Sequence, residues 1–321
     1  MRLQRIVQVL MYNCAMTNLN ADVESIETVG EAIEYSAQVL TNADVYFGHG
    51  TDNAWDEAVQ MVLFVAGLPA DSDRSVVTLL IERGQLSELR ANLTRRIEEN
   101  IPLPYLIGKA WFAGLEFRCD DRAIVPRSPI AELIRKEFSP WYVGPQVRTV
   151  LDLCCGGGCI GLACSHYLPD VKVDLLDLDP AALELAAENV AAMGMDDRVR
   201  IYQSDLFAAL PDNRYDLILS NPPYVDSQDL RSMPAEYHRE PELALGSGPD
   251  GLALTRKILA SAGQYLQPSG ILVLEVGNSW EALELAYPTV PFTWVEFEFG
   301  GHGVLILTAK ELQDYSASFI Q

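Results

Sequence analysis

The spacing of apolar positions changes along the chain and divides the sequence into two parts. Between about residues 28 and 100, apolar side chains recur at helical spacing in three stretches, Glu31–Leu40, Trp55–Ala66 and Leu86–Glu99. From residue 147 onward, short apolar runs typical of buried strands alternate with helical stretches. The pattern predicts a helical N-terminal domain followed by an α/β domain.

The C-terminal part is predicted to form a doubly wound, mostly parallel sheet of seven strands, because strands and helices alternate along it. The predicted strands are Thr149–Leu153, Val171–Leu176, Val199–Gln203, Leu217–Ser220, Ile271–Val276, Trp294–Phe299 and Gly303–Thr308. The predicted helices are Ile160–Leu168, Ala181–Met193, Leu252–Leu266 and Trp280–Tyr287. The last two strands are close enough in sequence to pair as an antiparallel hairpin through Gly300–Gly303.

Between the two parts lies a short connecting region. Trp111–Phe117 is predicted to form a hairpin or bent strand, and Val125–Pro129 a rigid turn into a helix over Ile130–Phe138. Four segments follow from these elements: an N-terminal tail (1–27), a helical domain (28–108), a hairpin and linker (109–146) and an α/β domain (147–321). We interpret the tail in part as an extension from an early start site.

Composition narrows the class of protein. In 321 residues, 49% are apolar and 21% charged, and no apolar run approaches the ~20 residues of a membrane span. Met1–Thr17 lacks the cleavage pattern of a signal peptide. A net charge of −22 and a pI of about 4.4 disfavour direct binding to nucleic acid and favour a basic partner.

The six cysteines are Cys14, Cys119, Cys154, Cys155, Cys159 and Cys164. They contain no Cys-x-x-Cys pair, and two of them are adjacent, so we expect neither a metal site nor a disulfide framework. Reduced thiols that serve as small apolar side chains fit a cytoplasmic protein.

Ligand-type residues follow the first predicted strand. Asp152 comes just before the loop Cys154-Cys155-Gly156-Gly157-Gly158, which opens a helix. Gly156, Gly158 and Gly161 fit the G-x-G-x-x-G pattern, so a dinucleotide such as NAD is one candidate. A carboxylate at Asp152 would repel a pyrophosphate, whereas it suits the ammonium and sulfonium of S-adenosylmethionine.

The next two strand ends carry acids as well. Asp177 can accept hydrogen bonds from both ribose hydroxyls of a nucleoside cofactor, whether NAD or S-adenosylmethionine. Asp205 and Leu206 follow the third strand, where an acid and an apolar side chain can hold an adenine edge and face. These positions favour S-adenosylmethionine as the cofactor.

The fourth strand ends in Asn221-Pro222-Pro223-Tyr224. Neither proline has a backbone N–H, so the stretch cannot continue a central ladder. It offers two acceptors, the Asn221 side-chain oxygen and the Pro222 carbonyl, beside the flat ring of Tyr224. This arrangement suits a planar –NH2 group whose two hydrogens must be held and whose plane must be fixed.

The order of these motifs resembles the N5-glutamine protein methyltransferases over nearly the whole chain. Several further stretches resemble the branch that acts on ribosomal protein L3 rather than the release-factor branch: 48–53, 109–112, 125–130, 238–243 and 275–279. The resemblance implies that Cys154–Gly158, Asp177, Leu206 and Asn221 line the cofactor and that Asn221–Tyr224 hold the substrate glutamine. The sequence departs from the family at Cys154 and Cys155, where relatives more often carry glycine or threonine, and at Leu206, where some carry tryptophan.

The resemblance implies transfer of a methyl group to a glutamine amide of ribosomal protein L3, with the helical domain recognising the protein substrate. Asn221, Pro222 and Tyr224 would be the catalytic residues, and Arg127 and Glu275 would support the turn and the loop near the cofactor. Alternatives are methylation of release factors, methylation of an exocyclic amine of nucleic acid, NAD-dependent oxidoreduction and a silent binding module. The sequence leaves the oligomeric state open.

Overall fold

The computed structural model describes residues 23–210 and 213–320. Most of the predicted N-terminal tail, including Cys14, lies outside the described residues. Clustering of contacts divides the chain into two compact units. The helical unit is Met1–Gly108 together with Pro234–Arg239, and the sheet unit is Lys109–Met233 together with Glu240–Gln321. The domain boundaries expected from the sequence remain predictions.

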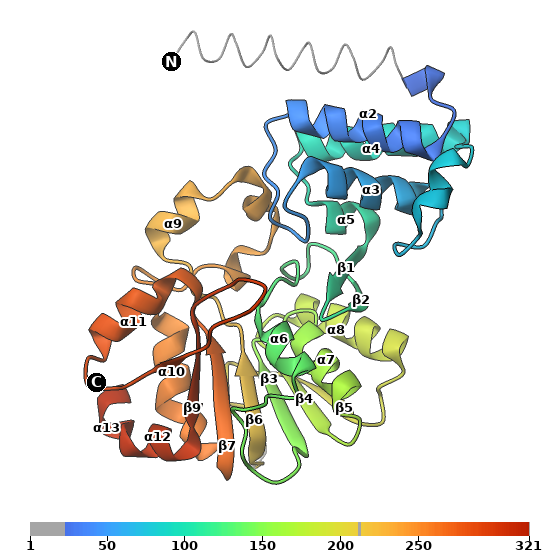
Figure 1. The fold of residues 1–321 in the computed structure, drawn as a ribbon. Helices are drawn as coiled ribbons and strands as arrows, with labels where there is room; N and C mark the ends of the chain where they lie inside the picture. The colour runs from blue at the N-terminus through green and yellow to red at the C-terminus, as the bar shows by residue number, and fades with distance from the viewer. Residues whose placement is uncertain (1–22, 211–212, 321) are drawn as a thin grey trace. The chain divides into compact units, whose positions relative to one another are not determined.

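The helical unit packs its helices around one apolar core (Figure 1). The Thr28 side chain and Glu31 cap the first long helix reciprocally, which satisfies free N–H groups at its start. The unit's elements are η1 (Val23–Ser25), α2 (Val29–Asn42), α3 (Ala54–Val65), η2 (Arg74–Thr78), α4 (Arg83–Glu98), α5 (Leu103–Ile107) and η3 (Ala235–Arg239). The three helices predicted from periodicity are therefore present, and each begins one to three residues earlier than the prediction.

A buried arginine joins the two chain segments of the helical unit. The Arg96 guanidinium on α4 donates to Glu57 of α3 at 2.5 Å and to Glu236 of η3 at 2.9 Å, and it also donates to the Tyr46 carbonyl at 2.7 Å. All three charged residues are at most 3% exposed. Because each charge has a partner, the cluster fixes Pro234–Arg239 against the helices.

The sheet unit contains seven strands in the order β5-β4-β3-β6-β7-β9-β8. The strands are β3 (Thr149–Leu153), β4 (Lys172–Asp177), β5 (Val199–Gln203), β6 (Tyr215–Ser220), β7 (Leu266–Glu275), β8 (Thr293–Trp294) and β9 (Val304–Thr308). β3 to β7 run parallel, and β9 pairs antiparallel with both β7 and β8. The predicted doubly wound, mostly parallel sheet and its terminal antiparallel pair are confirmed.

Helices cover both faces of this sheet (Figure 1). The helices of the sheet unit are α6 (Ile130–Arg135), α7 (Cys159–Tyr167), α8 (Pro180–Met193), α9 (Ser227–Ser232), α10 (Ala253–Ser261), α11 (Trp280–Ala286), α12 (Ala309–Asp314) and α13 (Ser316–Phe319), and its short turns are η4 (Glu242–Ala244), η5 (Ala262–Gln264) and η6 (Gly277–Ser279). No helix in the described part of the chain is long and apolar enough to cross a membrane.

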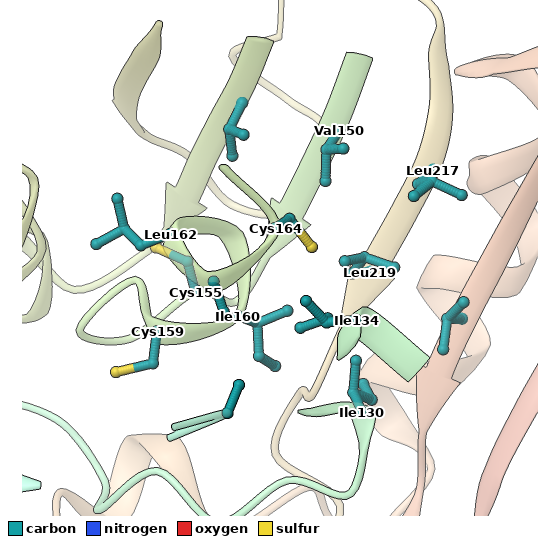
Figure 2. Packing of buried hydrophobic residues seen from close by; sticks show 14 of the residues in the cluster. Ile130, Ile134, Val150, Cys155, Cys159, Ile160, Leu162, Cys164, Leu217 and Leu219 are labelled. Carbon is teal, nitrogen blue, oxygen red and sulfur yellow. The ribbon is translucent and has the colours of Figure 1, made fainter. Parts of the chain in front are cut away.

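The side chains of alternate strand residues pack into two separate hydrophobic cores. Val150, Leu217 and Leu219 face the core that α6 and α7 cover, whereas Leu151 and Ile218 face the opposite core. Figure 2 shows three cysteines in the first core, packed among these aliphatic side chains as small apolar residues. The sheet is therefore buried on both sides, as parallel sheets require.

Several predicted elements differ in length from those observed. The helix predicted over Leu252–Leu266 ends at Ser261, because β7 begins at Leu266 and includes the turn-like residues Pro268 to Gly270. The strand predicted over Trp294–Phe299 is only Thr293–Trp294, at the edge of the sheet. The predicted hairpin is present as β1 (Lys109–Phe112) and β2 (Leu115–Arg118), and the following helix α6 is shorter than predicted.

Candidate active site

The strand order brings four strand ends together at one edge of the sheet. The chain runs outward from β3 to β4 and β5 and then returns to β6 on the other side of β3, which makes the β3–β6 border a topological switch point. Ligands of doubly wound sheets bind outside the carboxyl ends of strands at this border. The Ser220 hydroxyl at the end of β6 donates to the Leu153 carbonyl at the end of β3 at 2.7 Å, which ties the two ends together.

A pocket opens at this border, entirely within the sheet unit. It encloses about 740 Å³ of empty space, counted together with the open solvent at its mouth. Its walls are mostly apolar, with acids from the strand ends. It is lined by residues 122–124, 153, 154, 156, 176–179, 182, 204–206, 221, 223, 241, 243, 244 and 254.

Asp177, at the end of β4, lies in the pocket wall. One carboxylate oxygen accepts from the Gly156 N–H at 2.8 Å and the other from the Asp179 N–H at 3.0 Å, so the side chain holds the glycine loop. Burial raises the pKa of Asp177, against the effect of these backbone hydrogen bonds. The carboxylate keeps acceptor capacity for a ligand hydroxyl.

Asp152 lies below the loop and does not line the pocket. Its Oδ2 accepts from the Gly161 N–H in the first turn of α7 at 2.7 Å, while its Oδ1 meets no partner among the described residues. Burial raises the pKa of this carboxyl to about 7. Because an acid already occupies a donor at the helix N-terminus, a pyrophosphate is disfavoured there.

Two non-glycine residues of the pocket have left-handed backbones. The φ angle is 61° at Cys154 and 49° at Leu206, a conformation that costs free energy for L side chains. Strain of this kind persists at sites where the backbone must approach a ligand. A glycine would adopt the Cys154 conformation at lower cost.

Asn221 and Pro223 line the pocket directly after β6. The Asn221 side chain is half-buried and makes no hydrogen bond with another described residue, so its oxygen is open to a ligand. Pro222 is buried and Tyr224 half-buried beside them, and neither lines the pocket itself. Asn221 and Pro223 therefore contribute to the pocket wall, and Pro222 and Tyr224 adjoin them in sequence.

Six predicted cofactor residues share the pocket wall: Cys154, Gly156, Asp177, Asp205, Leu206 and Asn221. Cys155, Gly157 and Gly158 belong to the same loop but are buried behind its surface, like Asp152. Gly158 has a φ of 80° and lies against Leu175, so it serves close packing of the loop on the sheet. The roles assigned to these residues remain predictions.

The pocket also contains residues that the sequence motifs do not indicate. Pro241, Leu243, Ala244 and Leu254 form an apolar wall from η4 and α10. The first two belong to the stretch 238–243, which resembles the family but suggests no role by itself. Among the described residues that line the pocket, Arg122 is the one cation, and it is engaged by Asp120 at 2.7 Å and Glu188 at 2.8 Å.

Comparisons with known proteins give two general matches. The family model "Methyltransferase small domain" matches residues 138–236. Among solved structures, a methyltransferase from Pyrococcus furiosus is similar over 61% of this chain and 89% of its own, at 19% identity and a TM-score of 0.44.

Two relatives are much more similar in sequence. The ribosomal protein uL3 glutamine methyltransferase of Francisella tularensis is 46% identical over 298 residues, which cover 92% of this chain and 95% of the relative. The protein of the same name from Xanthomonas campestris is 44% identical, over 92% and 96% of the two chains. With this identity over almost the full length of both relatives, the chain belongs to the family of ribosomal protein uL3 glutamine methyltransferases.

Proposed function

We propose that this protein transfers a methyl group from S-adenosylmethionine to the side-chain amide nitrogen of a glutamine in ribosomal protein L3 (uL3). The single observation that carries the proposal is Asn221, whose open side-chain oxygen borders the same pocket as Asp177. The 44–46% identity to uL3 glutamine methyltransferases supports the choice of substrate.

The pocket suits S-adenosylmethionine better than a dinucleotide. Asp177 and Asp205 give the wall negative charge, which attracts the cationic cofactor and repels phosphates. Arg122, the cation in the described wall, is already paired with two acids. Apolar side chains such as Leu206 and Leu243 can sandwich an adenine.

The chemistry of the chain's own residues is mainly positioning. S-adenosylmethionine supplies a methyl group attached to a positively charged sulfur. The Asn221 side-chain oxygen and the Pro222 carbonyl accept the two hydrogens of the substrate amide, so that its nitrogen points along one direction. These acceptors also stabilise the positive charge that develops on the nitrogen during transfer.

The charge of the protein supports a basic protein substrate. With 45 acidic and 23 basic residues, the chain attracts a cationic partner over distances of about a Debye length. The same charge opposes approach to the phosphate backbone of free nucleic acid. We assign substrate recognition to the helical unit, which a methyltransferase acting on small molecules would not need.

Methylation of purified L3 with isotopically labelled cofactor tests the proposal. We expect L3 to gain one methyl group, located by mass spectrometry on a glutamine, and the signal to vanish when that glutamine is replaced by alanine. A release factor and protein-free ribosomal RNA serve as competing substrates. Methylation of either of these without methylation of L3 would overturn the proposal.

A further inference from the structure

Tyr224 is held at three separate points within the sheet unit. Its hydroxyl donates to Glu275 Oε1 at 3.2 Å, and its carbonyl accepts from the Ser279 hydroxyl at 2.8 Å. Its ring lies directly on Gly277, where an added Cβ would come within 2.4 Å of the ring. Gly277 also has a φ of 47°, so both its conformation and its lack of a side chain serve this packing.

Of the three residues that hold Tyr224 in these contacts, Glu275 is the one with an ionisable side chain. It is the last residue of β7 and only 4% exposed. Its second oxygen, Oε2, accepts from the Ser128 hydroxyl at 2.5 Å, and the Ser128 oxygen in turn accepts from the Ile130 N–H at 3.2 Å. The carboxylate therefore joins Tyr224 to the turn that precedes α6.

The groups around Glu275 leave it without a close ion pair in the described structure. Arg127, the nearest cation, donates both terminal nitrogens to Glu240, at 2.5 Å and 2.7 Å. On β9 the opposite residue is the apolar Val304, and His302 of the adjoining loop contacts Asn278. Burial raises the pKa of Glu275 to about 7, although Ser128, Tyr224 and Arg127 all act to lower it.

The charge state of this carboxyl decides how many hydrogen bonds it can accept. An ionised carboxylate accepts from the Tyr224 and Ser128 hydroxyls together. A protonated carboxyl is a donor at one oxygen. One of the two hydroxyls, that of Tyr224 or that of Ser128, must then either lose its hydrogen bond to Glu275 or accept the carboxyl proton instead of donating its own. Protonation therefore loosens either Tyr224 or the turn that supports it.

We propose that Glu275 is a positioning residue for methyl transfer, which fixes the Tyr224 ring through its hydroxyl and does so fully only when ionised. This inference rests on the proposed function, in which the ring fixes the plane of the substrate amide. The amide nitrogen is a poor nucleophile, and its orientation relative to the methyl donor determines the rate. Glu275 touches neither substrate nor cofactor and acts only through Tyr224.

The test is kcat for L3 methylation between pH 5.5 and 9 at saturating cofactor. For the parent enzyme we expect kcat to rise about tenfold as pH increases, with a midpoint near pH 7. We call this rise the acidic limb of the pH–rate profile. Glu275→Gln mimics the protonated carboxyl in shape, so it should stay at the low-pH level throughout, with KM for L3 and Kd for cofactor unchanged. Tyr224→Phe keeps the ring but removes the link, and should also abolish the limb.

Two further measurements distinguish titration of Glu275 from titration of other acids. Glu240→Gln removes the charge that neutralises Arg127, so the limb should move to lower pH rather than disappear. Asp152, whose pKa is also about 7, would show its titration in the Kd of the cofactor instead of kcat. A limb near pH 7 that survives in Glu275→Gln or in Tyr224→Phe would overturn the inference. Absence of L3 methylation by the parent enzyme would instead overturn the proposed function, and full kcat in Asn221→Ala would remove only the role assigned to Asn221.

Discussion

Replacing Asp177 by alanine is expected to weaken binding of S-adenosylmethionine without unfolding the protein. The carboxylate already accepts from Gly156 and Asp179, and its remaining acceptor capacity is available to the ribose hydroxyls. Loss of a charged acceptor costs roughly 1.5–3 kcal/mol, or about 10- to 150-fold in Kd. The lower end is favoured, because burial already penalises the charge of Asp177 in the free protein.

Isothermal titration calorimetry of the parent and the variant measures this change. Asp179→Ala is a matched control, since Asp179 lies in the same pocket wall and the change removes the same charge two residues further along. Asp179 caps α8 by accepting from the Ala181 N–H at 2.9 Å, so this control should lose about 1 kcal/mol of stability and much less affinity. Equal losses of affinity in the two variants would refute a specific ribose contact, and unchanged affinity in a folded Asp177→Ala would remove this residue from the site.

Four further outcomes follow from the same structure. Asn221→Ala should lower kcat roughly 10²–10³-fold with little change in cofactor Kd, by analogy with deletion of one oxyanion-hole donor; wild-type kcat would exclude its role. Glu275→Gln should stabilise the free protein at pH 8 but not near pH 4. The pKa of Glu275 rises from 4.5 to about 7 on folding, so the free energy of unfolding of the parent falls by at most about 3 kcal/mol as pH rises through this window. Denaturant titrations at both pH values check the sign. Arg96→Met should lower the free energy of unfolding by about 3–5 kcal/mol, because Glu57 and Glu236 stay buried without their cation. A triple variant that also carries Glu57→Gln and Glu236→Gln should recover much of this loss, and equal losses in the two variants would contradict the account. Methylation of L3 should slow as salt rises and the Debye length falls from about 10 Å to about 3 Å, and a salt-independent kcat/KM would rule out electrostatic steering.

The sequence predicted the parts of the fold that local patterns determine. The bounds of β3 and β5 match the predicted strands residue for residue, because short apolar runs between turn residues define buried strands clearly. The four consecutive strand ends bearing Asp152, Asp177, Asp205 and Asn221 predicted one edge of the sheet as the site. Parallel pairing aligns these ends regardless of the details of side-chain packing.

The remaining features depend on contacts between distant segments. The apolar wall of Pro241 and Leu243 comes from a turn without periodicity, and only the folded chain brings it to the strand ends. Asp152 was expected to contact the cofactor, yet it lies under the loop, because the helix N–H of Gly161 competes for its carboxylate. The link from Tyr224 to Glu275 spans 51 residues and has no sequence signature.

The insertion of Pro234–Arg239 into the helical unit has a consequence for synthesis of the chain on the ribosome. Glu236 follows Arg96 by 140 residues, so the guanidinium waits on the order of 10 s for its second acid at ordinary translation rates. By then the segments that form β3 to β6 have already been made. The helical unit therefore completes its folding after much of the catalytic sheet has emerged. A gene fusion that transferred only residues 1–108 to another enzyme would deliver Arg96 with Glu57 but without Glu236, so the transferred unit would lack one of the two buried ion pairs of this guanidinium.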